Sequence, residues 1–237
     1  MKLIDELLDS VTHVDCSVRR ACVGLHWTVV ESKHTGMAHT YKTGNKVELE
    51  SSGNLVGKSA LELAQRLRSW EPLEASLGVA ALNSLIGPVG NPGNVFEDIL
   101  GLAVGKTVTV IGRFPSNDQI AQAAGQVYFL EMEPQDGELP PSACEEVIPE
   151  SDIVVITATA LINKTLPRLL GLSRHAAAIV LGPSTPMNDV LFRHGADVLA
   201  GVRVTDTDAL ISSVMQGVKK FNKLADIEPV TCFSTDR

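Results

Sequence analysis

The fold is decided by the stretch Ala178-Ile179-Val180-Leu181-Gly182-Pro183-Ser184-Thr185-Pro186, in which an apolar run gives way to glycine, proline and hydroxyl residues. An apolar run without polar alternation is typical of a parallel strand that is covered on both faces. The segment that follows offers backbone amides and the hydroxyls of Ser184 and Thr185. Open α/β sheets bind ligands at such strand ends. We therefore predict a strand that ends at a ligand site, although Gly182 and Pro183 could simply form a turn.

Two other segments repeat this pattern. Val108–Ile111 is followed by Gly112-Arg113-Phe114-Pro115, and Ile153–Ile156 is followed by Thr157-Ala158-Thr159 and then Asn163. The carboxyl ends of parallel strands meet at one edge of a sheet. Three such ends favour a single shared site, with Gly112, Thr157 and Gly182 at its rim.

Helices and strands alternate from Val95 onward. Alternation of this kind predicts a doubly wound parallel sheet with right-handed crossovers. The predicted helices are 95–103, 116–124, 142–147, 164–170, 187–193 and 206–223, and the predicted strands are 107–111, 126–130, 152–156, 177–181 and 197–200.

The first half has strands followed by helices, which predicts an α+β unit. The segment Gly87–Asn94 contains three glycines and two prolines, so we place a domain boundary there and expect domains at 1–90 and 91–237. The elements predicted before the boundary are a helix at 1–12, strands at 16–23, 25–30 and 46–49, and helices at 57–68 and 72–85.

Composition limits the function classes. The 237 residues carry a net charge of −8, and no Lys or Arg occurs between Phe114 and Asn163, which disfavours nucleic acid as a partner. No apolar run approaches the roughly 18 to 20 residues of a membrane span. The four cysteines form no Cys-x-x-Cys pair, and the N-terminal segment Met1–Glu6 carries acids where a signal peptide has bases followed by an apolar run. We therefore expect a cytoplasmic protein with a small-molecule ligand; a homo-oligomer stays open.

The segment Gly112–Pro115, which follows the predicted strand 107–111, does not have the sequence of a dinucleotide-binding loop. Arg113, Phe114 and Pro115 stand where Gly-x-Gly-x-x-Gly has residues that let backbone approach phosphate. Arg113 could bind a carboxylate or phosphate through two parallel hydrogen bonds, or pair with a neighbouring acid. Glu131 ends the second strand at the spacing from which an acid binds a ribose diol, so an adenosine-type ligand stays open. Alternatively, Glu131 is the first exposed residue after a strand.

Other candidates are polar groups and histidines. Asn163 and Thr165 could recognise a ligand or cap the next helix. Ser184 is not in a Gly-x-Ser-x-Gly elbow, which disfavours a serine nucleophile. His34 and His39 lack metal-ligand spacing and predict a surface loop; if that loop covers the strand ends, a histidine could act as acid or base, and we assign this role to His34.

Together, the motifs resemble the DUF364 family, described as a heavy-metal chelation domain, preceded by a DUF4213 domain. The resemblance lies in Val110–Pro115, Leu130-Glu131, Ser151–Thr165 and Leu181–Pro186, and, for DUF4213, in Gly24–Trp27 and Gly36–Ala38. It implies an enolase N-terminal-like domain, a Rossmann-like domain and a site between them.

The resemblance also implies the handling of a pterin-, flavin- or siderophore-like molecule linked to metal chelation. We hypothesise an interdomain-cleft enzyme with Glu131 and His34 as acid–base candidates. The alternative is a non-catalytic protein that binds a metal or metal chelate. No cofactor or metal ligand set follows from the sequence. The residues expected to bind the ligand are Gly112, Arg113, Phe114, Thr157, Asn163, Thr165, Gly182, Pro183, Ser184 and Thr185.

Overall fold

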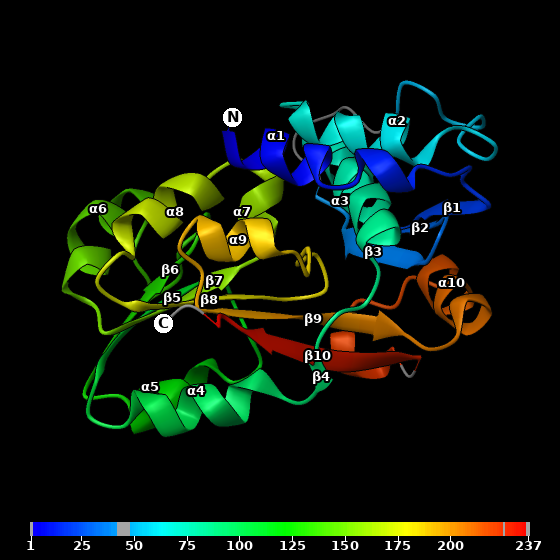
Figure 1. Cartoon of the computed structure of the whole chain (residues 1–237). Coiled ribbons are helices and arrows are strands. Elements are labelled where there is room, and N and C mark those ends of the chain that lie inside the picture. Colours follow the sequence, from blue (N-terminus) through cyan, green and yellow to red (C-terminus); the bar gives the residue numbers. More distant parts are fainter. Residues whose placement is uncertain (1, 42–47, 225, 236–237) are drawn as a thin grey trace.

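The first half of the chain is built around a three-stranded antiparallel sheet. The structure, a computed structural model, describes residues 2–41, 48–224 and 226–235. The sheet has the order β1-β2-β3 (Figure 1). Its elements are α1 (Lys2–Asp9), β1 (Arg20–Val23), β2 (Trp27–Glu31), β3 (Thr35–His39), α2 (Ala60–Ala64) and α3 (Pro72–Ile86), with short 3₁₀ turns at Thr12–Val14 and Gln65–Arg68.

Helix α3 is the centre of this half. Almost all of its side chains are buried, as expected of a helix that is apolar on every side. It lies so close to β3 that a Cβ atom on Gly36 would be 2.3 Å from the carbonyl oxygen of Ala80. Glycine at position 36 therefore allows the close contact between β3 and α3.

The position of the third strand corrects the sequence prediction. We expected a strand at 46–49 and a surface loop around His34 and His39. Residues 42–47 lie outside the described part, and 48–49 are not in a strand. Instead, β3 pairs with β2 in a hairpin. Glycine at position 36 suggested a loop, whereas its role is close packing against α3.

The second half contains a seven-stranded, mostly parallel sheet. Its order is β4-β10-β9-β8-β7-β5-β6, in which β6, β5, β7, β8 and β9 are parallel and β10 is antiparallel to both of its neighbours, β9 and β4. The strands are β4 (Asn91–Pro92), β5 (Thr107–Ile111), β6 (Gln126–Leu130), β7 (Ile153–Thr157), β8 (Ala177–Leu181), β9 (Val198–Val204) and β10 (Ile227–Phe233). The helices are α4 (Val95–Ala103), α5 (Asn117–Ala123), α6 (Cys144–Val147), α7 (Thr159–Ile162), α8 (Leu166–Leu172), α9 (Asp189–Arg193) and α10 (Thr207–Met215), and the 3₁₀ turns are Pro141–Ala143, Ile148–Glu150 and Phe221–Lys223.

The reversed strand β10 corrects the expected all-parallel sheet. We predicted one helix over 206–223, but α10 ends at Met215 and Gly217 follows with φ 77°. A left-handed glycine just past a helix is a common stop signal. The chain then returns as β10, antiparallel to β9. The sequence also did not predict helix α7, which lies between Thr157 and Asn163.

Helices cover both faces of the large sheet. Helices α4 and α5 lie on one face, and α7, α8 and α9 lie on the other (Figure 1). The core on the second face is continuous with the core of the first half, since one cluster includes Leu7, Leu77, Leu161 and Leu191. On the far side of the small sheet, Val29 and Met37 pack with Leu210 and Val214 of α10. The two halves therefore share apolar cores, while the boundary at residue 90 stays a prediction.

Candidate functional site

A cavity of about 970 Å³ lies at the carboxyl ends of the parallel strands. Its walls come from the segments that follow β5, β6, β7 and β8, and from β2, β3 and Tyr41 of the first half. The strand order changes direction at β5, because β6 lies on one side of it and β7 on the other. Ligands of doubly wound sheets bind at such a switch point. Of the predicted site residues, the cavity brings together Gly112, Arg113, Phe114, Glu131, Thr157, Asn163, Thr165, Gly182, Pro183 and Ser184.

Gly112 lets β5 and β7 approach each other at the switch point. Its φ is 110°, and a Cβ atom there would be 2.9 Å from the Cβ of Thr157. A side chain at this position would meet both backbone strain and a steric clash. Phe114 packs against Phe96, with ring centroids 5.8 Å apart, and forms an apolar part of the cavity wall.

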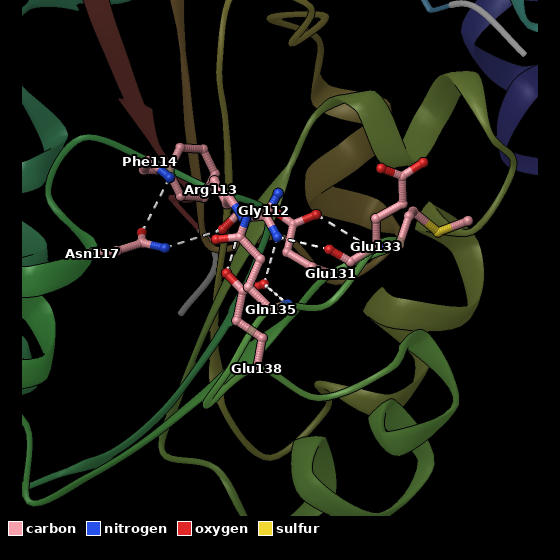
Figure 2. A network of polar contacts seen from close by, with 9 residues as sticks. Gly112, Arg113, Phe114, Asn117, Glu131, Glu133, Gln135 and Glu138 are labelled. Atoms are coloured by element: carbon pink, nitrogen blue, oxygen red, sulfur yellow. Dashed lines mark hydrogen bonds and ion pairs between the residues drawn. The ribbon is translucent and has the colours of Figure 1, made fainter.

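Arg113 is held by acids rather than left free. Its Nε and one terminal nitrogen donate to the two carboxylate oxygens of Glu138, at 2.9 and 2.5 Å, and the same terminal nitrogen donates to the Glu133 carbonyl at 2.8 Å (Figure 2). The bidentate pair lowers the pKa of Glu138. The pairing of Arg113 with a neighbouring acid, one of the two options that the sequence left open, is present in the structure.

Glu131 lies beside this pair but outside it. One of its carboxylate oxygens is 4.0 Å from Arg113 Nε, and the other accepts a hydrogen bond from the Met132 amide at 3.3 Å. Its side chain is 17% exposed. Burial raises the pKa of Glu131, although Arg113 acts in the opposite direction. Glu131 is therefore a partly desolvated carboxyl group at the cavity wall, able to exchange a proton closer to neutral pH than an exposed glutamate.

The segment after β7 supplies hydroxyl and amide groups. The hydroxyls of Thr157 and Thr159 are 3.0 Å apart. The Asn163 side-chain oxygen accepts from the Thr165 amide and hydroxyl, and Thr165 itself makes no side-chain cap bond to α8. Lys164 between them has φ 69°, and burial lowers the pKa of its amine to about 8. This strained turn holds the polar side chains at the rim.

The segment after β8 links the two halves. The Ser184 hydroxyl is buried and accepts a hydrogen bond from the His39 amide of β3 at 2.9 Å. Thr185 does not line the cavity; its single hydroxyl proton is shared between the carbonyls of Gly182 and Ala200, which lie 2.7 and 2.9 Å from Oγ1. Thr185 therefore supports the turn from behind, and Ser184 is the hydroxyl at the cavity wall.

The first half contributes an aromatic wall that the sequence analysis missed. Trp27 and His39 face each other across β2 and β3 with ring centroids 5.7 Å apart, and Tyr41 is 6.2 Å from His39. His39 is the last residue of β3, and Tyr41, two positions later, also lines the cavity. Recognising the hairpin would have revealed this wall.

His39, and not His34, lies at the cavity. His34 is not among the lining residues, and its ring packs against Gly87. Burial, with the nearby charges of His26 and Lys219, lowers the pKa of His39, so its imidazole is neutral at neutral pH. The Trp27 Nε1 and His39 Nδ1 atoms are buried without a hydrogen-bond partner in the described part of the chain. A neutral imidazole is the form in which histidine accepts a proton.

A metal site does not follow from the described side chains. They include no group of three or more His, Cys, Asp or Glu residues that could hold a metal ion. At the cavity, ligand-type side chains are His39, Glu131 and Cys144, which form no such group. Within residues 2–41, 48–224 and 226–235, no helix is long and apolar enough to cross a membrane.

The fold and cavity define a mixed α/β protein with a ligand-sized chamber between a small antiparallel sheet and the strand ends of a larger, mostly parallel one. The chain belongs to the DUF364 family. The DUF364 pattern matches residues 94–225 and the DUF4213 pattern matches residues 4–86, and both carry the description "Putative heavy-metal chelation".

Solved relatives have the same fold. A DUF364 protein of unknown function from Desulfitobacterium hafniense is 28% identical, with a TM-score of 0.86 over 98% of this chain and 97% of its own. One from Pyrococcus horikoshii is 18% identical, with a TM-score of 0.79 over 98% of both chains. An uncharacterized protein of Methanocaldococcus jannaschii is 27% identical over 70% of this chain, and the match spans 66% of that protein's length.

Proposed function

We propose that this protein is an enzyme that binds a small planar metabolite of the pterin, flavin or siderophore kind in the chamber and acts on it in the metabolism of metal chelators. The observation that carries the proposal is the 970 Å³ cavity, because its volume lies in the range of small-molecule sites. Aromatic side chains on both sides suit a flat ring: Trp27 and Tyr41 belong to one half, and Phe96 and Phe114 to the other.

Two titratable groups at the wall support a chemical role. Glu131 has a raised pKa and His39 a lowered one, each because of burial first. Perturbed acids and bases in a cavity are typical of general acid–base sites. We assign the acid–base role first to Glu131, with His39 as the second group. His34 stays a candidate only if the site extends beyond the described lining.

The second candidate is a non-catalytic carrier of a metal chelate. It is favoured by the family description together with the lack of a three-ligand side-chain cluster in the described part. A metal would then arrive already bound by an organic chelator, and the protein would recognise the chelator. In this function Glu131 would contribute affinity but not turnover.

We also propose finer fold assignments. The strand order of β5–β9, with the first strand between the second and third, supports a Rossmann-like domain. An enolase N-terminal-like domain for residues 1–90 is supported by the DUF4213 match to residues 4–86.

The test combines binding with product analysis. Purified protein is screened by thermal shift against pterin, riboflavin and 2,3-dihydroxybenzoate, each with and without Fe(III), and against Fe(III) alone. A ligand at one hundred times its Kd adds about 2.7 kcal/mol to stability. Ligands that stabilise are then incubated with protein and analysed by mass spectrometry.

Three outcomes separate the candidates. A mass change that Glu131→Gln abolishes supports the enzyme; the matched variant Glu146→Gln, on the exposed surface of α6, should leave it intact. Stabilisation only by the iron complexes, with no mass change, supports the carrier. If no organic ligand stabilises the protein but a bare metal ion does, both proposals are wrong.

A further inference from the structure

Glu131 occupies the place of a diol-binding acid. Strand β6 lies next to β5, with Leu130 paired to Ile111, so Glu131 and Gly112 follow neighbouring strand ends. In doubly wound sheets that bind nucleotides, an acid about 20 positions after the first glycine accepts hydrogen bonds from a ribose diol. Gly112 and Glu131 have about this spacing, and both line the cavity.

The hydrogen-bonding capacity of Glu131 is largely unused. An ionised carboxylate has about four acceptor positions. Within the described part, its one hydrogen bond is from the Met132 amide at 3.3 Å, and Arg113 Nε at 4.0 Å is beyond hydrogen-bonding range. Two adjacent hydroxyl groups would match the two oxygens of this carboxylate. The surrounding wall includes Ile111, Leu130 and Met132, which suit the apolar part of such a ligand.

The same end of the cavity is unsuited to phosphate. The amides of Gly112, Phe114 and Asn117 already donate to Leu130, Asn117 and Phe114 respectively, and Pro115 has no N–H. The charge of Arg113 is paired with Glu138 in a bidentate contact (Figure 2). Unused loop amides and free cations are what bind pyrophosphate in nucleotide folds. At this end of the cavity, these three amides and the Arg113 guanidinium already have partners within the protein.

Resting on the proposed function, we propose that Glu131 binds the vicinal diol of a phosphate-free ligand. The diol belongs either to the ribose of a nucleoside or to the ring of a catechol. Glu131 is thereby a specificity-determining residue that selects two neighbouring hydroxyls and, with the tied Arg113, selects against phosphorylated ligands.

Calorimetric titration of the full-length protein tests this with matched probes. Adenosine is compared with 2′-deoxyadenosine and AMP, and catechol with 2-methoxyphenol. We expect one of the two diols to bind, identifying the source, and its one-hydroxyl analogue to bind at least tenfold more weakly. AMP should bind more weakly than adenosine. Glu131→Gln should remove the preference for the diol, while Glu146→Gln retains it, and circular dichroism establishes that both variants are folded.

The diol proposal is overturned if the analogue binds as well as the diol, if folded Glu131→Gln keeps the preference, or if neither diol binds at millimolar concentration. None of these results would overturn the proposed function, because a planar ligand without a diol could still stabilise the protein and be turned over. The thermal-shift and mass-spectrometry screen tests that function separately. Conversely, diol binding without any mass change in the ligand would support this inference and overturn the enzyme proposal.

Discussion

At the scale of single residues, two neighbouring glutamates have opposite electrostatic environments. Glu138 accepts both hydrogen bonds of the Arg113 fork, which lowers its pKa, whereas burial raises the pKa of Glu131. Arg113 satisfies the first carboxylate and lies 4.0 Å from the second. Arg113 therefore pairs with Glu138 and leaves Glu131 partly desolvated beside it. Different environments of this kind commonly give two neighbouring carboxyl groups different pKa values and different roles.

A pH-dependent stability difference follows for Glu131→Gln. A carboxyl group whose pKa is raised in the folded state contributes stability below its unfolded pKa and loses that contribution as pH rises through the folded pKa. The groups that act on Glu131 are Arg113, Glu133, Glu138 and the Met132 amide. We expect Glu131→Gln to have a higher Tm than the wild type at pH 7.5 and an equal Tm at pH 4. Equal Tm values at both pH values, measured by calorimetry, would show that Glu131 is not desolvated.

The release of Arg113 gives a second prediction at this scale. Glu138→Gln removes the charge that holds the Arg113 fork, so the guanidinium is free to pair with Glu131. The pKa of Glu131 should then fall toward or below that of an exposed glutamate, since an opposite charge favours the ionised form. Carbon-detected NMR titration of the Glu131 carboxyl would measure this. An unchanged or higher pKa would mean that Arg113 does not move to Glu131.

At the scale of elements, close backbone contacts position the cavity walls. Strand β3 packs directly on α3 because position 36 has no side chain, and β3 in turn brings His39 to the cavity. The hairpin register then places Trp27 opposite His39. A side chain at position 36 that pushes β3 away from α3 would therefore also displace His39 and the aromatic wall.

Gly36→Ala should destabilise the protein by about 1–3 kcal/mol, the usual cost of overpacking. Its Cβ would lie 2.3 Å from the Ala80 carbonyl oxygen and the Ser84 amide nitrogen, so backbone must shift. The matched control is Gly101→Ala at an exposed position of α4, where no atom of the described residues outside the local helix backbone lies within 4 Å of the added Cβ, and alanine should stabilise by about 0.5–1 kcal/mol. Urea denaturation measures both; a Gly36→Ala variant as stable as Gly101→Ala would contradict the tight packing.

At the scale of the whole molecule, the chamber exists because the two halves pack together. The small sheet lies between α3 of its own half and α10 of the other, and one apolar cluster runs through both halves. Ser184 adds a buried hydrogen bond to the His39 amide across this junction. The cavity and the junction between the halves therefore share a residue.

Ser184→Ala should cost about 1–3 kcal/mol of stability, because it leaves a partly buried amide without its acceptor. It should also weaken ligand binding, since β3 is no longer held to the strand-end segment. Ser212→Ala, at an exposed position of α10, is the control and should change stability by less than about 0.5 kcal/mol. Thermal denaturation with and without ligand distinguishes the two effects. If Ser184→Ala binds the ligand as tightly as the wild type, the hydrogen bond between Ser184 and His39 does not contribute to ligand binding.

Local residue patterns were enough to predict the parallel strands and the edge of the sheet at which the cavity lies. Strands β5, β6 and β8 have the predicted bounds, because continuous apolar runs bounded by glycine, proline or polar residues encode buried strands locally. Gly112, Glu131, Thr157 and Ser184 follow those strands, so their gathering at one edge follows from parallel topology alone.

The partners of these residues depend on contacts between segments that are far apart in the chain. The antiparallel pairing of β10, the choice of His39 over His34 at the cavity and the capture of Arg113 by Glu138 each join segments distant in the chain. A strand such as β3 has little intrinsic β-propensity and exists because it packs on α3 and pairs with β2. Contacts of this kind depend on the position of the whole backbone, which local residue patterns do not encode.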